Sequence, residues 1–142
     1  MTKVYKVFFA SILFLVVSCG KTYTNEDLKV MNGYWEIEKA KMPEGEVKDY
    51  TINASIDYFE INEKGEGIRQ KVMPQVNGEY LTNEVAEKLT IINENGITWL
   101  KYKTDFAEWK EELIKLDEDE FVVKNENDIM YYYKKAVPFT LK

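Results

Sequence analysis

The chain lacks histidine altogether and contains a single cysteine, Cys19. Without histidine it cannot build a Ser-His-Asp or Cys-His catalytic group, it has no imidazole base at neutral pH, and most zinc and copper sites are excluded. With one cysteine it cannot form an internal disulfide, so packing alone must hold the fold. We therefore expect a protein that is not an enzyme, with no catalytic residue, no metal site and no cofactor.

Acidic residues are the remaining source of simple catalysis, since two carboxylates are enough for glycoside hydrolysis. The main acidic runs, at residues 117–120 and 126–128, are instead typical of solvated turns. The loop spacing of an EF-hand calcium site is missing as well. We interpret these runs as the tips of hairpins.

Basic residues are scarce: 19 lysines and arginines stand against 25 acidic residues, which gives a net charge of −6. Nucleic acids bind through clustered lysine and arginine that displace counterions, so we expect no nucleic-acid partner. The sequence also offers no polybasic segment for anionic lipid.

The sequence has one long uncharged apolar run, at residues 7–17. Its 11 residues are about half of the roughly 20 that a transmembrane helix needs. Lys3 and Lys6 precede the run and Cys19 follows it, which is the layout of a cleavable secretory signal over residues 1–18. An ordinary secreted protein with a chance cysteine at its cleavage site is the alternative. Cleavage would leave 17 basic and 25 acidic residues, a net charge of −8.

The segment Val16-Val17-Ser18-Cys19 resembles the lipobox of bacterial lipoproteins. The resemblance implies that the sulfur of Cys19 carries a diacylglycerol, that the chain is cut before Cys19 and that the new amino terminus receives a fatty acid such as palmitate. Several acyl chains give durable membrane attachment. We expect a lipidated cysteine and short tether over residues 19–26 and one folded domain over residues 27–142. Because Gly20 follows the cysteine, with no aspartate resembling an inner-membrane retention signal, we expect the outer membrane, facing the periplasm.

Beyond the tether the sequence is typical of an all-β protein. Thr24, followed three residues later by Asp27, predicts a capped helical turn through Met31. After that, runs rich in β-branched and aromatic residues alternate with turn residues. The eight strands that we predict are 34–41, 55–62, 67–73, 86–93, 97–104, 109–116, 120–125 and 129–135.

Several of these strands alternate between apolar and polar residues. In one of them Ile68 and Val72 face one way, whereas Arg69 and Lys71 face the other. Such alternation predicts one buried and one wet face. In residues 131–133, three consecutive tyrosines leave the inward side ambiguous.

The lengths of the connections between strands predict that the two ends of the barrel differ. Tight turns at residues 63–65, 95–96 and 117–119 belong to one end, and Asn95-Gly96 is a strong hairpin signal. The connections 42–54 and 74–85 are each about a dozen residues long and belong to the other end, since successive connections of an up-and-down barrel alternate between its ends. We therefore expect one sealed end and one looped mouth.

Gly33-Tyr34-Trp35, just after the helical turn, resembles the Gly-x-Trp motif of the lipocalin family. The resemblance implies an eight-stranded antiparallel up-and-down barrel. It also implies that Gly33 and Trp35 help to close one end, with Trp35 packed against a basic residue of the last strand. That residue is Lys134 or Lys135, and we name Lys134 as the barrel-closing cation.

Aromatic residues make up 14% of the chain. In an eight-stranded barrel such residues either fill the interior or grip one small ligand, and aromatic side chains are also ordinary strand formers. The candidate ligand-binding residues are Tyr58, Phe59, Trp99, Tyr102, Trp109, Tyr131 and Tyr133.

Two functions remain open for this predicted monomer. The first is a membrane-anchored lipoprotein that binds a small apolar or amphipathic ligand inside its barrel. The second is an envelope module that binds a protein partner or inhibitor through its exterior or through the connections 42–54 and 74–85, with no internal ligand.

Overall fold

The computed structural model describes residues 21–137, except for the side chains of residues 83 and 84. The predicted signal (residues 1–18), Cys19 and the last residues, 138–142, lie outside the described residues. Among the described residues, no helix is both long and apolar enough to cross a membrane.

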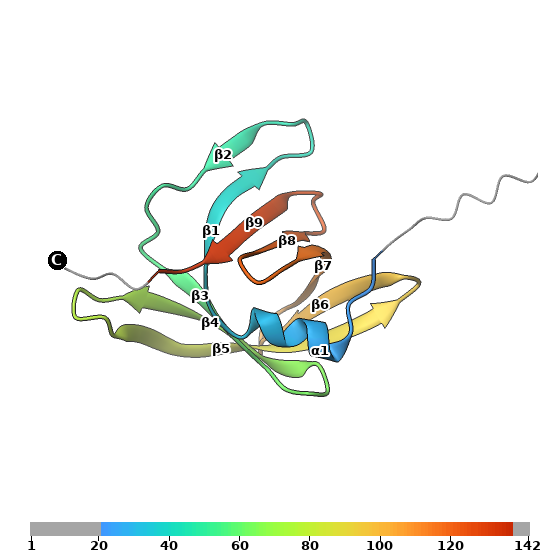
Figure 1. Ribbon diagram of the computed structural model, residues 1–142, viewed down its shortest axis with the longest axis horizontal. Coiled ribbons are helices and arrows are strands. Elements are labelled where there is room, and N and C mark those ends of the chain that lie inside the picture. Colours follow the sequence, from blue (N-terminus) through green and yellow to red (C-terminus); the bar gives the residue numbers. More distant parts are fainter. Residues whose placement is uncertain (1–20, 138–142) are drawn as a thin grey trace, which may run out of the picture.

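The described chain forms a closed antiparallel β-barrel (Figure 1). Neighbouring strands pair in the order β1-β3-β4-β5-β6-β7-β8-β9, and β9 pairs again with β1. This confirms the predicted eight-stranded up-and-down barrel. A short ninth strand, β2, which was not predicted, pairs with the last residues of β1. The strands are β1 (Gly33–Lys41), β2 (Val47–Asp49), β3 (Ile56–Ile61), β4 (Glu66–Pro74), β5 (Tyr80–Glu94), β6 (Ile97–Lys103), β7 (Glu108–Leu116), β8 (Glu120–Lys124) and β9 (Met130–Lys135).

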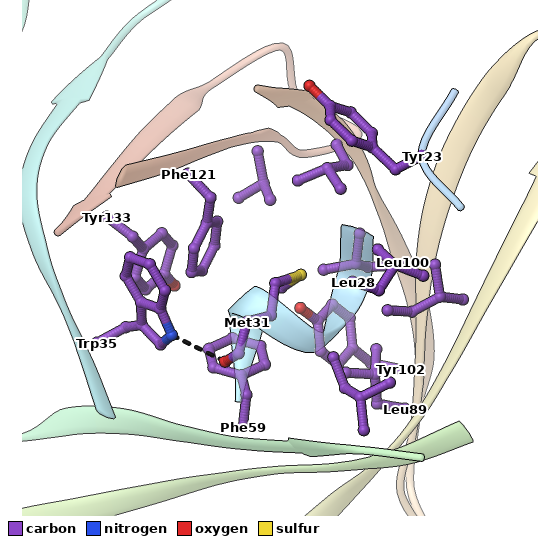
Figure 2. Packing of buried hydrophobic residues seen from close by; sticks show 14 residues of the cluster. Tyr23, Leu28, Met31, Trp35, Phe59, Leu89, Leu100, Tyr102, Phe121 and Tyr133 are labelled. Carbon is purple, nitrogen blue, oxygen red and sulfur yellow. Dashed lines mark hydrogen bonds between the residues drawn. The ribbon is translucent and has the colours of Figure 1, made fainter. Parts of the chain in front are cut away.

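A short helical segment precedes the barrel, as predicted. It consists of α1 (Asn25–Leu28) followed by the single 3-10 turn η1 (Lys29–Met31). Thr24 and Asp27 cap it reciprocally: the Thr24 side chain accepts from the Asp27 backbone N–H, and the Asp27 carboxylate accepts from the Thr24 backbone N–H. The segment turns Leu28 and Met31 into the barrel core (Figure 2). The barrel end on this side is the closed end.

The core lies inside the barrel, on the face that alternate residues of each strand share. Trp35 meets Phe121 edge to face at 4.7 Å between ring centroids, and Phe121 stacks on Tyr133 at 4.4 Å (Figure 2). Buried aromatic pairs of this kind add to the stability that burial of apolar area supplies. The remaining buried members of the cluster are Tyr23, Leu28, Met31, Phe59, Ile61, Leu89, Ile91, Leu100, Tyr102, Leu113 and Val123.

The prediction of a long loop at residues 74–85 is wrong. Strand β4 continues to Pro74 and β5 already begins at Tyr80, so the connection is a hairpin, with the Gln75 N–H bonded to the Glu79 carbonyl oxygen at 2.8 Å. A register shift in the β4–β5 pairing breaks the alternation on which the prediction depended. The connection 42–54 is also partly strand, since it contains β2.

Arg69 and Lys71 of β4 face inward, contrary to the wet face that alternation suggested for them. Arg69 pairs directly with Phe59, and Lys71 with Asp57. Residues directly opposite each other on antiparallel strands share a face, so Arg69 and Lys71 lie on the inner side with buried Phe59. Partners of opposite charge, described below, make this placement possible.

Candidate functional site

The barrel interior has two chemically different halves. Around α1 and η1 it is apolar, whereas the half towards the other end contains charged and hydroxyl-bearing side chains. Residues directly opposite each other on adjacent strands contribute these side chains. For example, Arg69 on β4 is directly opposite Glu87 on β5. This inner polar cluster consists of Asp57, Arg69, Lys71, Glu87, Tyr102, Glu111 and Tyr133.

Arg69 stands at the centre of the inner polar cluster, with 11% of its side chain exposed. Its Nε donates to Glu87 Oε2 at 2.5 Å, and its Nη1 lies 4.0 Å from Glu111 Oε2. Its guanidinium carbon is 4.0 Å from the Tyr102 ring centroid and 6.0 Å from that of Trp109. Two carboxylates and two aromatic faces thus compensate for the lost hydration of this cation.

Asp57 is the most deeply buried charged residue of the cluster, at 2% exposure. Lys71 Nζ donates to its Oδ1 at 2.7 Å, and Tyr133 Oη donates to its Oδ2 at 3.0 Å. Burial raises the pKa of Tyr133 well above the ordinary value for tyrosine, so its hydroxyl keeps the proton that it donates. About half of the Lys71 side chain is exposed, which indicates that solvent reaches this part of the barrel.

Two buried polar atoms of the cluster, Tyr102 Oη and Glu111 Oε2, make no hydrogen bond of good geometry among the described residues, although the Tyr102 hydroxyl and the Glu111 carboxyl interact with each other. Tyr102 is 2% exposed and Glu111 is 7% exposed. Burial raises the pKa of both groups. Buried polar atoms are nearly always well paired in folded proteins, so these two atoms, which we call the orphaned pair, are a candidate contact for a water molecule or a ligand group.

The structure separates the seven aromatic residues that were predicted to bind a ligand. Tyr58 and Trp99 lie on the outer face, so their placement in the interior was wrong: the Tyr58 hydroxyl donates to Glu60 at 3.1 Å, and Lys110 Nζ lies 4.2 Å from the Trp99 ring centroid. The other five point inward. Phe59, Tyr102 and Tyr133 are buried, whereas Trp109 and Tyr131 are half-buried.

At the closed end, Lys135 rather than Lys134 packs against Trp35. Lys135 is directly opposite Trp35 in the β1–β9 pairing and its Nζ lies 4.3 Å from the ring centroid. Lys134 points outward and pairs with Glu36 at 3.3 Å. Strand alternation decides between the two lysines. Gly33 lies beside Lys135 with φ +115°, a value that side-chain-bearing residues rarely adopt.

Sequence reasoning missed the charged members of the cluster. One signal for them existed: the tight turn at residues 62–65 fixes the register of β3 and β4 and so places Arg69, the chain's single arginine, opposite Phe59. No comparable signal identified Glu87 or Glu111, which belong to more distant hairpins.

Two hollows open on the outside of the barrel. One, of about 470 Å³, lies over β5, β6 and β7, and its lining includes four lysines and two glutamates. The other, of about 210 Å³, lies beside Tyr23 and Leu116. Within residues 21–137, no group of acidic side chains is arranged to hold a metal ion.

The comparisons with known proteins found structural likeness only. No protein-family model matches the chain. No curated protein matches it either. Among solved structures it is similar to an uncharacterized protein from Bacteroides eggerthii DSM 20697, with 12% identity and a TM-score of 0.48, covering 75% of this chain and 99% of that one. It is also similar to a lipocalin-like protein from Bacteroides uniformis ATCC 8492, with 8% identity, a TM-score of 0.48 and the same coverage. The barrel assignment itself stands on the strand order and register of this chain.

Proposed function

We propose that the protein is a lipid-anchored binding protein of the cell envelope, without catalytic activity, whose barrel holds one small amphipathic molecule in its polar half. The observation that carries this proposal is the orphaned pair, Tyr102 Oη and Glu111 Oε2, beside the buried guanidinium of Arg69. A buried ionic cluster costs desolvation energy that apolar packing would avoid, which favours a role in recognition.

The cluster narrows the chemistry of the ligand that the sequence suggested. A wholly apolar molecule would add no partner to the orphaned pair, whereas a hydroxyl or ammonium group can donate to Glu111 Oε2. The half-buried rings of Trp109 and Tyr131 offer apolar surface for the rest of the molecule. The ligand is therefore amphipathic, with its polar group directed to the floor of the polar half.

The contacts of Tyr23 support one orientation of the barrel on the proposed membrane. Its backbone N–H donates to Thr98 Oγ1 at 3.0 Å, its carbonyl oxygen accepts from Asn93 Nδ2 at 3.0 Å, and its hydroxyl accepts from the Leu116 N–H at 3.1 Å. The contacts of the barrel thus reach into the predicted tether. With lipid on Cys19, only about 14 Å of extended chain would separate the anchor from Tyr23. The closed end then faces the bilayer and the polar half faces away from it.

Native mass spectrometry tests the ligand. The full-length protein is extracted from its own membranes in mild detergent, as wild type and as Glu111→Gln. The neighbouring Glu112→Gln is the matched control, because Glu112 faces outward and pairs with Lys124 at 3.1 Å. We expect a small-molecule adduct on wild type and control that is reduced at least tenfold in Glu111→Gln. A bare mass for wild type, or equal adducts on all three proteins, contradicts the proposal.

The proposed location, the outer membrane facing the periplasm, has its own test. Protease added to intact cells should leave the protein whole, and protease added after outer-membrane permeabilisation should degrade it. Degradation in intact cells would place the barrel on the cell surface instead.

A second candidate function, an envelope module that binds a protein, is favoured by the apolar side chains at the end opposite α1. Phe106 is 98% exposed and Ile52 is 90% exposed. Met73, Val76 and Val47 are also exposed there, in a region where a soluble surface would ordinarily carry polar residues. Crosslinking in living cells should then recover one dominant partner, which a Phe106→Ser, Ile52→Ser double variant loses. If the double variant recovers the same partner, this candidate fails.

A further inference from the structure

The hollow over β5, β6 and β7 is a basic groove on an acidic protein. It lies on the outer wall of the barrel, although the inward-facing residues Tyr102 and Trp109 also contribute to its lining. Its volume of about 470 Å³ is within the usual range of small-molecule sites, roughly 300–1,000 Å³. Its lining includes four lysines, Lys88, Lys101, Lys103 and Lys110, together with Glu108 and Glu126, and we call it the lysine groove.

The lysines of this groove oppose one another directly across the strands. Lys88 pairs with Lys103 between β5 and β6, and Lys101 pairs with Lys110 between β6 and β7. Like charges directly opposite in a sheet are destabilising. Two such pairs side by side, in a chain whose net charge is −6, therefore work against the stability of the barrel.

Most of this positive charge is not neutralised. Lys103 pairs with Glu108 at 3.1 Å, but Lys88, Lys101 and Lys110 have no carboxylate within ion-pair distance among the described residues. Lys110 lies 4.2 Å from the Trp99 ring centroid, which fixes its position without removing its charge. The groove thus retains three lysines without an ion pair, against the single unpaired carboxylate of Glu126 in its lining.

We propose that the lysine groove binds a small molecule that carries two phosphate groups. Directly opposed residues lie about 5 Å apart, and residues two apart along a strand lie about 7 Å apart. The four ammonium groups therefore form a cluster that two neighbouring phosphates can occupy together. Binding offsets the repulsion that the two opposed pairs create.

The position of the groove disfavours an anionic bilayer as its occupant. Lys103 and Lys88 lie towards the end opposite α1, whereas the turns beside Tyr23 carry Glu94 and residues 117–119, which are acidic. The end nearest the expected anchor would repel anionic headgroups. A small molecule with two phosphate groups reaches the exposed side wall of the barrel without approaching that acidic end.

Isothermal titration of the full-length protein in detergent with fructose 1,6-bisphosphate, as a probe with two phosphates, tests the proposal. Wild type is compared with Lys101→Glu and with Lys64→Glu, which makes the same charge change in an exposed turn at the closed end. We expect Lys101→Glu to weaken binding at least tenfold while raising the thermal midpoint of the ligand-free protein, because an opposed pair of like charges becomes a pair of opposite charges. Lys64→Glu should leave binding within twofold.

Three results would overturn the proposal. The first is no binding of the bisphosphate at 1 mM, on the order of the weakest affinity a specific site would have. The second is equal weakening by the two substitutions, which indicates attraction to net charge alone. The third is sedimentation of the detergent-free Cys19→Ser protein with vesicles of anionic lipid that Lys101→Glu abolishes, which identifies a bilayer as the occupant.

Discussion

The ammonium group of Lys135 lies over the ring of Trp35 and bonds to the chain just before β1. Its Nζ is 4.3 Å from the ring centroid and donates to the carbonyl oxygens of Val30 and Asn32 at 3.2 and 3.3 Å. Trp35 Nε1 in turn donates to the Met31 carbonyl oxygen at 2.8 Å (Figure 2). One lysine and one tryptophan thus join β9, β1 and the helical segment at the closed end.

Removing the Lys135 ammonium should loosen this end. Lys135→Met keeps the aliphatic stem but loses the cation–π contact and two hydrogen bonds, so we expect the free energy of unfolding to fall by about 1–3 kcal/mol in urea titration. Lys134→Met is the control, because Lys134 makes one exposed ion pair, and it should change stability by less than about 0.5 kcal/mol. Equal losses in the two variants would show that the contact with Trp35 contributes nothing.

Gly67 is required by the close approach of β3 and β4. A Cβ atom built there would lie 1.7 Å from the Glu60 backbone carbonyl oxygen. We expect Gly67→Ala to destabilise the barrel by about 3 kcal/mol or more, because backbone must move to relieve the overlap. Gly45→Ala, where φ is +99° and nothing lies within 4 Å, should cost only about 1–2 kcal/mol. Thermal unfolding of both variants by circular dichroism measures the difference, and a smaller loss for Gly67→Ala would contradict the register.

Glu111 should make stability depend on pH. Burial raises its pKa in the folded protein above the ordinary 4.5, so between these values the folded state keeps a proton that the unfolded state has released. The contribution of Glu111 to the free energy of unfolding therefore falls as pH rises through that interval. The fall is about 1.4 kcal/mol for each pH unit by which the folded-state pKa exceeds the unfolded-state pKa.

Glu111→Gln removes this titration. The free energy of unfolding of the variant minus that of wild type should increase when urea titrations at pH 7.5 are compared with those at pH 4. The increase for Glu111→Gln is measured against Glu112→Gln, which makes the same substitution on the outer face beside Lys124. A difference for Glu111→Gln that is the same at both pH values would refute the burial argument.

Lipidation of Cys19 is expected to decide where the protein resides. Cys19→Ser should shift it from the membrane pellet to the soluble envelope fraction and abolish incorporation of labelled palmitate, because no other group would hold the lipid. Ser18→Ala, which keeps a small residue before the cysteine, should remain in the pellet. Palmitate label on the Cys19→Ser protein would rule out this anchor.

The strand pattern and the capped turn could be read from the sequence because their causes are local. The Thr24 and Asp27 cap depends on residues three apart, and the turn at Asn95-Gly96 on two residues that accept positive φ. Residues 80–85 were not recognised as strand because a register shift there breaks the alternation.

The sequence by itself therefore determined the all-β class and the number of barrel strands, since hydrophobic period and turn residues act over a few positions. Tertiary structure alone decided which side chains share the interior. Arg69 faces inward because Glu87, Tyr102 and Glu111, carried by three other strands, compensate for its charge there. Likewise, strand register selected Lys135 over Lys134 for Trp35. Contacts between strands that are distant in sequence form only when the barrel closes. The pattern of residues within one strand therefore does not predict them.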